Sequence, residues 1–500
     1  MAAESLEGRL LHLLATKTPV LMVVTDSEER IDAAISACVA ALPVKTEIWS
    51  WTITEGLRRG RTVLEGATEI AKALHVAAKL DRPAVFFFKD LHAILRKDPD
   101  PWLIRRLKDL AAVFPAQGKA LVFRSAVNSV PEDLASTVAV VEDAPPTRGE
   151  LLALVREWAA QGEGASEPPA SEVEVRFLRA ARGLPLYEVR RILGRHDRGS
   201  PDALGRVVAE LWDEKARFVR RGGLLELVPA DASLEQVGGL QNFKAWLERR
   251  RDVFTEAGQQ AGVMPPRGVL LMGITGCGKS IAVKAAASFW GLPLFRLDMV
   301  RLYGGEFGPP EEAIRRAIRW AETLAPCVLW MDEIEAGITV AGHKAEGGPA
   351  SRLLGYFLTW MQERRAPVFV GATANAIELL PAEVLRKGRF DEIFYVSLPA
   401  KAERREIFRV HLTSRGIVPE GLNLELVAHA TNGFSGSEIE QVVATALLAA
   451  RSEGRPLTDL DLATSVSRTV PMSVTMAEQI KRIEGWAFHR AVRASPEDKG

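Results

Sequence analysis

Eight residues in the middle of the chain constrain its fold more than any others. The run Gly273-Ile274-Thr275-Gly276-Cys277-Gly278-Lys279-Ser280 fits the pattern G-x-x-x-x-G-K-[ST]. An apolar run, 268–272, precedes it, and an alanine-rich run, 281–290, follows it. A strand, a glycine-rich loop and a helix in this order direct backbone N–H groups and the positive end of the helix dipole at one point. The sequence therefore predicts a phosphate-binding loop.

Two acidic residues end a later apolar run, 327–331. A phosphate-binding loop followed by such a pair is typical of enzymes that hydrolyse nucleotides, because one acid holds Mg²⁺ and the other activates water. We expect Asp332 to hold Mg²⁺ together with the hydroxyl of Ser280. Lys279 would reach the β- and γ-phosphates, and Glu333 would be the general base.

A further strand and an arginine-containing loop complete the candidate site. The apolar run 368–374 leads to Asn375, whose amide can orient a water molecule. Arg386 and Arg389 lie three residues apart on a predicted loop, where they are candidates for stabilising charge at the γ-phosphate. Exposed arginines with a purely structural role are the alternative.

The first 145 residues repeat the same rhythm without the same chemistry. Apolar runs at 20–25, 46–51, 84–88, 119–125 and 136–141 alternate with helical patterns, which favours a parallel α/β sheet. Where the phosphate loop would stand, the chain has Thr25-Asp26-Ser27-Glu28-Glu29-Arg30, and Lys89-Asp90 replaces the acidic pair. We interpret this region as a degenerate domain that does not hydrolyse nucleotide. An unrelated α/β module is the alternative.

The helical segments suggest a tandem duplication. The segment 182–189 is similar to 432–439, since each turns at a glycine and opens a helix. The predicted domains are a degenerate α/β domain (1–145), a helical lid-like subdomain (146–200), a linker helix and junction (201–232), an α/β core (233–400), a helical lid (401–475), and a C-terminal helix with a polar tail (476–500).

The composition excludes several classes of protein. Lys plus Arg equals Asp plus Glu at 64 each, so no overall charge attracts nucleic acid. No apolar run reaches the ~18 residues of a membrane span. Three cysteines without metal-ligand spacing are typical of a reducing cytoplasm.

Taken together, these motifs resemble the AAA branch of the AAA+ ATPases. More narrowly, nearly the whole chain resembles the Ycf-type AAA proteins of cyanobacteria, plastids and other bacteria. The segments that carry the resemblance are 237–240, 273–280, 332–333, Asn375, 386–391 and 433–437, and for the narrower family the leading domain, 222–226 and 354–361.

The resemblance implies a P-loop sheet with a helical lid, ATP and Mg²⁺ as cofactors, and a ring-shaped homo-oligomer, most often a hexamer. Asn375 would sense the γ-phosphate, and Arg386 and Arg389 would act on the site of the neighbouring subunit. The implied nucleotide-binding residues are Val237 and Gly238 at the adenine, the loop residues Gly273, Ile274, Thr275, Gly276, Cys277, Gly278, Lys279 and Ser280, and Ile281.

The sequence departs from the family at the expected pore loop. Ring translocases have an aromatic residue, a hydrophobic residue and glycine there, and this chain has Glu306-Phe307-Gly308. Substrate threading is therefore open, and a structural loop is the alternative. Three functions remain: an ATPase that remodels an unidentified protein client, a nucleotide-dependent switch or scaffold, and, least favoured, a DNA-remodelling ATPase.

Overall fold

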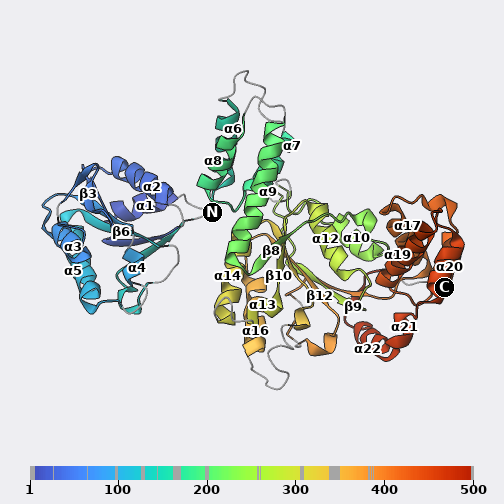
Figure 1. Ribbon diagram of the computed structural model, residues 1–500. Helices are drawn as coiled ribbons and strands as arrows, with labels where there is room; N and C mark the ends of the chain where they lie inside the picture. Colours follow the sequence, from blue (N-terminus) through green and yellow to red (C-terminus); the bar gives the residue numbers. More distant parts are fainter. Residues whose placement is uncertain are drawn as a thin grey trace. The chain divides into compact units, whose positions relative to one another are not determined.

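The protein forms two compact units, each built around its own sheet. In the computed structural model, one unit comprises residues 1–168 and 184–203, and the other comprises 169–183 and 204–500 (Figure 1). We call them the first and the second unit. The structure describes residues 6–25, 28–64, 66–89, 91–95, 99–125, 130–143, 145–160, 171–197, 202–255, 258, 261–303, 309–336, 349–380, 383–384, 386 and 388–496.

The sheet of the first unit has the strand order β4-β3-β2-β5-β6-β1-β7. The strands β2, β5, β6, β1 and β7 pair in parallel, as the continuous apolar runs predict. An antiparallel hairpin of β3 and β4, which was not predicted from the sequence, extends the sheet beyond β2. The strands are β1 (Val20–Val24), β2 (Glu47–Thr52), β3 (Gly56–Arg59), β4 (Thr62–Val63), β5 (Ala84–Phe88), β6 (Lys119–Ser125) and β7 (Ala139–Glu142).

Helices cover both faces of this sheet. Val20 and Met22 of β1 belong to one buried cluster and Leu21 and Val23 to another, because successive strand residues point to opposite faces. The first cluster includes α3 and α5, and the second includes α1 and α2. All helices described in the first unit, whether or not they cover the sheet, are α1 (Leu6–Ala15), α2 (Glu28–Ala41), α3 (Ile70–Lys79), α4 (Leu91–Leu95), α5 (Pro101–Gln117), α6 (Arg148–Ala160) and α8 (Leu186–Arg195).

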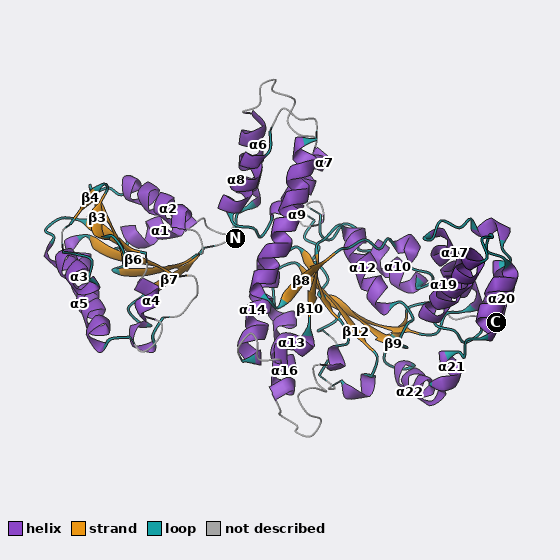
Figure 2. Ribbon diagram, in the orientation of Figure 1, coloured by secondary structure: helices purple, strands orange, loops and turns teal. Residues whose placement is uncertain are grey.

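The sheet of the second unit has the order β14-β13-β9-β12-β11-β10-β8. All neighbouring strands pair in parallel except β8, which is antiparallel to β10. Figure 2 labels β8, β10, β12 and β9 of this sheet, drawn in orange. The strands are β8 (Leu225–Val228), β9 (Gly268–Gly273), β10 (Leu294–Leu297), β11 (Cys327–Met331), β12 (Val368–Ala374), β13 (Glu392–Val396) and β14 (Val492–Arg493).

Two helical layers enclose this second sheet. Val269 and Leu271 of β9 pack with α10 and α12, while Leu270 and Met272 pack with α14 and α16. The helices are α7 (Ser171–Ala181), α9 (Ala203–Gly222), α10 (Gln241–Glu248), α12 (Lys279–Trp290), α13 (Met299–Tyr303), α14 (Pro310–Thr323), α16 (Pro349–Glu363), α17 (Lys401–Thr413), α18 (Leu424–Ala430), α19 (Gly436–Ser452), α20 (Asp459–Ser467), α21 (Met472–Thr475) and α22 (Ala477–Ala487).

A helical lid follows the sheet, and the last described residues return to the core. Helices α17 to α20 pack around their own apolar cluster, which fits the predicted lid. After α22, β14 adds a parallel edge strand beside β13, and Ser495 donates a hydrogen bond to Glu403 of α17. The sequence analysis expected only a helix and a polar tail there, because two residues are too few to give a strand pattern.

The two sheets confirm the predicted fold class of two α/β domains, one with a helical lid. When the order of the first sheet is read from β7, the strands β7, β1, β6, β5, β2 and β3 take the places of β13, β9, β12, β11, β10 and β8. Even the antiparallel strand, β3 or β8, stands at the same place. The domain boundaries drawn from the sequence remain predictions.

Candidate functional site

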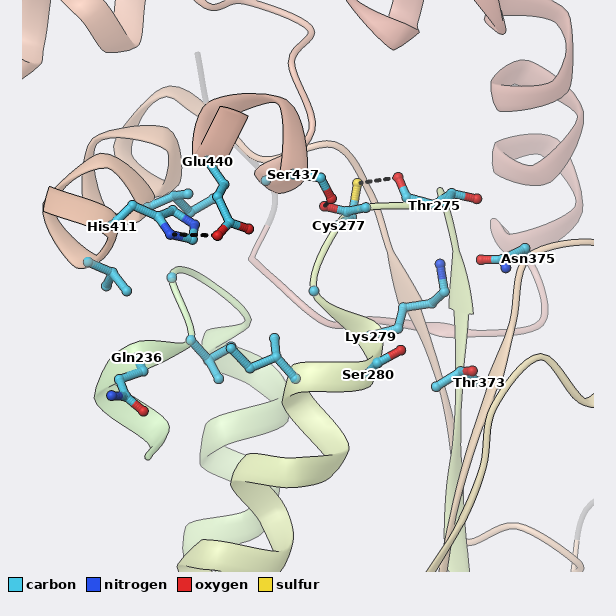
Figure 3. A pocket seen from close by; sticks show the side chains of 18 of the residues that line it. Gln236, Thr275, Cys277, Lys279, Ser280, Thr373, Asn375, His411, Ser437 and Glu440 are labelled. Atoms are coloured by element: carbon cyan, nitrogen blue, oxygen red, sulfur yellow. Dashed lines mark hydrogen bonds and ion pairs between the residues drawn. The ribbon is translucent and has the colours of Figure 1, made fainter. Parts of the chain in front are cut away.

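A cavity of about 320 Å³ lies at the carboxyl end of the second sheet (Figure 3). The phosphate loop, the ends of β11 and β12, and the lid helices α17 and α19 form its walls. Twelve of the predicted site residues line the cavity: Val237, Gly238, Thr275, Gly276, Cys277, Gly278, Lys279, Ser280, Ile281, Asp332, Glu333 and Asn375. The structure thus brings together residues up to about 140 positions apart in the chain, as parallel strands ending at one sheet edge require.

Gly273 and Ile274 do not line the cavity, but they hold the lysine that does. The Lys279 Nζ donates hydrogen bonds to the carbonyl oxygens of Gly273 and Ile274, at 3.0 and 2.7 Å. A side chain at position 273 would place its Cβ 2.1 Å from the Val396 carbonyl oxygen, so the loop requires glycine there. Burial lowers the pKa of Lys279. The ammonium group therefore lies against the backbone of the loop, with little water around it.

Ser280 and Asp332 meet as the spacing predicts. The Ser280 Oγ donates to the Asp332 Oδ1 at 3.0 Å. A hydroxyl and a carboxylate are the hard oxygen donors that Mg²⁺ prefers, and Mg²⁺ keeps several waters and phosphate oxygens as its other ligands. Among the described residues no cluster of three or more His, Cys, Asp or Glu side chains could hold a metal ion by itself. The donors at Ser280 and Asp332 fit a nucleotide-bound Mg²⁺.

Glu333 is fixed by the neighbouring strand. The Asn375 Nδ2 donates to the Glu333 Oε1 at 2.7 Å. The backbone N–H of Glu333 donates to the Thr373 Oγ1 at 2.9 Å, and Thr373 donates in turn to Asp332 at 2.6 Å. The sequence analysis missed Thr373. It lies two residues before Asn375, hence on the same face of β12, and that period could have identified it.

The lid contributes a wall whose residues were not among the site residues predicted from the sequence, although Gly436 and Ser437 lie in the segment 433–437 that carries the family resemblance. The backbone N–H and the Oγ of Ser437 both donate to the Gly276 carbonyl, at 3.0 and 3.1 Å, so α19 closes on the phosphate loop. Burial lowers the pKa of His411, while the nearby carboxylate of Glu440 opposes that shift. Amphipathic lid helices give no sequence signal for such positions. The cavity-lining residues that were missed are Gln236, Thr373, Ile407, Val410, His411, Gly436, Ser437 and Glu440.

Val237 and Gly238 meet the lid at the other end of the cavity. A Cβ at position 238 would lie 2.5 Å from the Ile407 Cγ1 and 3.1 Å from the Ile407 backbone nitrogen. Glycine at 238 therefore lets α17 approach the segment before α10. Ile407, Val410 and His411 of α17 line this end of the cavity.

Arg386 and Arg389 do not line the cavity of their own chain. Arg386 is 69% exposed and lies 3.9 Å from the Glu383 carboxylate, and Arg389 donates to the Glu383 backbone carbonyl. The pore-loop residues Glu306, Phe307 and Gly308 lie outside the described residues, as does Lys387. Within the described part of the chain, no helix combines the length and apolar character needed to cross a membrane.

Comparison with known families and proteins agrees with this geometry. Residues 6–142 match the SpoVK-like AAA ATPase N-terminal domain, 269–398 the ATPase family associated with various cellular activities (AAA), and 421–463 the AAA+ lid domain. The uncharacterized AAA domain-containing protein ycf46 of Guillardia theta is 32% identical over 490 residues, which cover 96% of this chain and 94% of that protein. The protein of the same name from Trieres chinensis is 31% identical over 491 residues, covering 97% of each chain.

More distant relatives match less than half of the chain. The human ATPase family gene 2 protein homolog A is 33% identical over 229 residues, 45% of this chain and 26% of that protein. A parallel sheet of this order, with a phosphate loop, paired acids and a lid, defines a P-loop ATPase domain of the AAA type. The chain belongs to the AAA ATPases and, within them, to the family of the ycf46 AAA domain-containing proteins.

Proposed function

We propose that the chain binds Mg²⁺-ATP in the cavity of the second unit and hydrolyses it. The observation that carries this proposal is the hydrogen-bonded series Ser280–Asp332–Thr373–Glu333–Asn375 beside the buried ammonium of Lys279. The proposed metal ligands, general base and cation thus line one cavity. Preorganised charges and dipoles in a protein site act on a phosphoryl group more strongly than the same groups do in water.

The roles of the residues follow from their positions. Lys279 exchanges its two carbonyl partners for phosphate oxygens, and the N–H groups of the loop hold the same group. Glu333 accepts a proton from the attacking water, and the Asn375 amide keeps that carboxylate aimed. The adenine of ATP would lie at the other end of the cavity, between Val237, Gly238, Ile407 and His411. Bound Mg²⁺ would supply charge neutralisation at the β- and γ-phosphates.

We propose further that the site is completed by a second copy of the chain. Arg386 and Arg389 do not line the cavity of their own chain, and Arg386 is exposed, which suits cations donated to the neighbouring subunit of a ring. ATP turnover would then depend on assembly. The expected ring is a hexamer, located in the cytoplasm.

The work done by this cycle is proposed to be remodelling of a protein client. The alternative is a nucleotide-dependent switch or scaffold that does not thread substrate, favoured by Glu306 where translocases have an aromatic residue. Phe307→Ala separates the two. Loss of client remodelling with ATPase activity intact supports threading, and full retention of both supports the switch.

The test of the base is Glu333→Gln. General-base catalysis contributes about 10²–10⁴-fold, so we expect ATP hydrolysis to fall at least about 100-fold. Nucleotide affinity should change little, because the amide still accepts from Asn375. The measurements are phosphate release and binding of a fluorescent ATP analogue, with EDTA abolishing turnover. Glu28→Gln, an acid at the equivalent end of the first sheet, is the matched control. Parental turnover by Glu333→Gln would show that the base is misassigned.

A further inference from the structure

A third carboxylate lies directly behind the candidate site, in the turn after the acidic pair. Glu335 is only 6% exposed and does not line the cavity. Its Oε1 accepts two backbone hydrogen bonds from the end of β12, from the N–H of Asn375 at 2.6 Å and from that of Ala376 at 3.2 Å. Burial raises the pKa of Glu335, and the hydrogen bonds from these two N–H groups oppose that shift. Glu335 therefore ties the chain after β11 to the chain after β12.

The bond reaches the residue whose side chain aims the proposed base. Glu335 holds the backbone of Asn375, and the side chain of Asn375 donates to Glu333. Because Glu333 and Glu335 are two residues apart, the segment 333–335 and Asn375 form a closed loop of contacts. A rotation of the Asn375 backbone would move its amide away from Glu333.

Glu333 needs this support because its backbone is in an unfavourable conformation. Its φ is +48°, the left-handed region that non-glycine residues rarely adopt and that costs of order 1 kcal/mol or more. A short turn follows, in which the Ala336 N–H donates to the Glu333 carbonyl at 2.8 Å. The conformation directs the side chain of Glu333 to the cavity and that of Glu335 to β12.

We propose that Glu335 is a positioning residue for ATP hydrolysis, which sets the orientation of Asn375 and through it that of Glu333. The proposal rests on the proposed function of the site and deepens it. Burial of a carboxylate is costly unless it is hydrogen-bonded. The hydrogen bonds of Glu335 come from the one backbone segment that carries Asn375.

The experiment compares Glu335→Ala with Glu335→Gln in the full-length protein. The glutamine oxygen can accept the same two N–H groups, whereas alanine cannot. We expect Glu335→Ala to lower kcat about 10- to 100-fold, the cost of misplacing a reacting group by an ångström or less. The affinity for ATP should stay within about threefold, since Glu335 is not in the cavity. Glu335→Gln should keep kcat within about threefold of the parent.

A matched control distinguishes positioning from stability. Asp461 of the lid is a buried carboxylate (8% exposed) that also accepts a backbone N–H, from Thr458 at 2.9 Å. Asp461→Ala should lower Tm without separating kcat from ATP affinity. If Glu335→Ala behaved in the same way, with both quantities falling in proportion to Tm, or turned over at the parental rate, the positioning role would be excluded.

A second measurement does not depend on ATPase activity. Hydrogen–deuterium exchange of the peptide spanning 374–378 should show faster exchange of the Asn375 and Ala376 amides in Glu335→Ala and parental protection in Glu335→Gln. If Glu335→Ala does not fold, Glu335→Asp, one methylene shorter, replaces it with the same expectation. A parent without ATPase activity would refute the proposed function, whereas unchanged protection in the variant would refute the role of Glu335.

Discussion

The two sheets of this protein share one strand order but place their charges in opposite ways. In the second unit the cation, Lys279, is on α12, the helix that follows β9, and the acids Asp332 and Glu333 directly follow β11. In the first unit the equivalent helix, α2, carries the acids Glu28 and Asp32, and the strand ends carry the cations Lys89 and Arg124. The polarity of the site is inverted.

These inverted charges pair with one another. The Lys89 Nζ lies 2.7 Å from Asp32 and 3.8 Å from Glu28, and Arg124 lies 3.0 Å from Glu28. The cations that could attract a phosphate are thus occupied, and a phosphate at the start of α2 would meet Glu28 and Glu29. Asp26, Ser27 and Asp90 lie outside the described residues. We propose that this exchange of charges between helix and strand is what prevents the first unit from holding phosphate.

Among the substitutions that distinguish the two units, replacement of Lys279 is expected to have the largest effect. Lys279→Ala removes the buried cation and should abolish nucleotide binding by the whole chain, because we expect no second nucleotide site in the first unit. Isothermal titration with ATP and Mg²⁺ should give one site per chain in the parent and none in the variant. The matched control is Lys89→Ala, which should bind ATP normally. Residual binding of half the parental stoichiometry would mean that the first unit holds nucleotide.

The next effect tests whether the second site is complete within one chain. Arg386→Ala combined with Arg389→Ala should lower ATP turnover at least about 100-fold with binding retained, as expected for cations that act only on the transferred phosphate. Phosphate release by the purified double variant, at concentrations where the parent assembles, is the measurement.

Mixing variants shows where those arginines act. The double variant has an intact pocket, and Lys279→Ala has intact arginines, so a mixture should regain activity if the arginines act on a neighbouring subunit. A mixture that stays inactive although mixed assemblies form would place the arginines on their own pocket, contrary to the proposal.

The sequence predicted the residues that local patterns define and missed those that tertiary contacts define. The phosphate loop and Asp332 stand in short motifs whose spacing follows from one strand, one turn and one helix. Thr373 acts across strands, and His411 and Glu440 reach the cavity only because Ser437 closes the lid on Gly276. The hairpin β3–β4 and the strand β14 were missed because short edge strands carry little periodic pattern.

The degenerate loop of the first unit shows what a sequence can and cannot exclude. The missing glycine and lysine predicted that phosphate is not held there, which depends on local chemistry alone. The pairing of Lys89 with Asp32, 57 residues away, could not be predicted, because it depends on how α2 packs relative to the end of β5. The inversion of charge therefore became visible only with the fold.

A smaller effect, on the free energy of unfolding, is expected when Lys89 of the first unit is replaced. Lys89 is 11% exposed and its partner Asp32 47% exposed, so the pair is neither fully buried nor at the surface. Replacing Lys89 by methionine, which keeps the length of the side chain, should cost about 1–2 kcal/mol, between the values for exposed and buried pairs. Chemical unfolding of the full chain, followed by exchange of β5 and α2 peptides, measures it. A stability equal to that of the parent would mean that the pairing is incidental.

The smallest effect concerns the second cation of the same cluster. Arg124 is 17% exposed and shares only Glu28, itself 45% exposed, so solvent screens the pair and its loss should cost about 0.5 kcal/mol. Because Glu28 also faces Lys89, the two cations are not independent, and a double-mutant cycle of Arg124→Met with Lys89→Met should give a nonadditive sum. In the double variant Glu28 and Asp32 face each other without a cation, so the combined cost should exceed the two single costs. Strict additivity would mean that the two strand ends hold α2 separately, and that the inverted site is two ion pairs rather than one cluster.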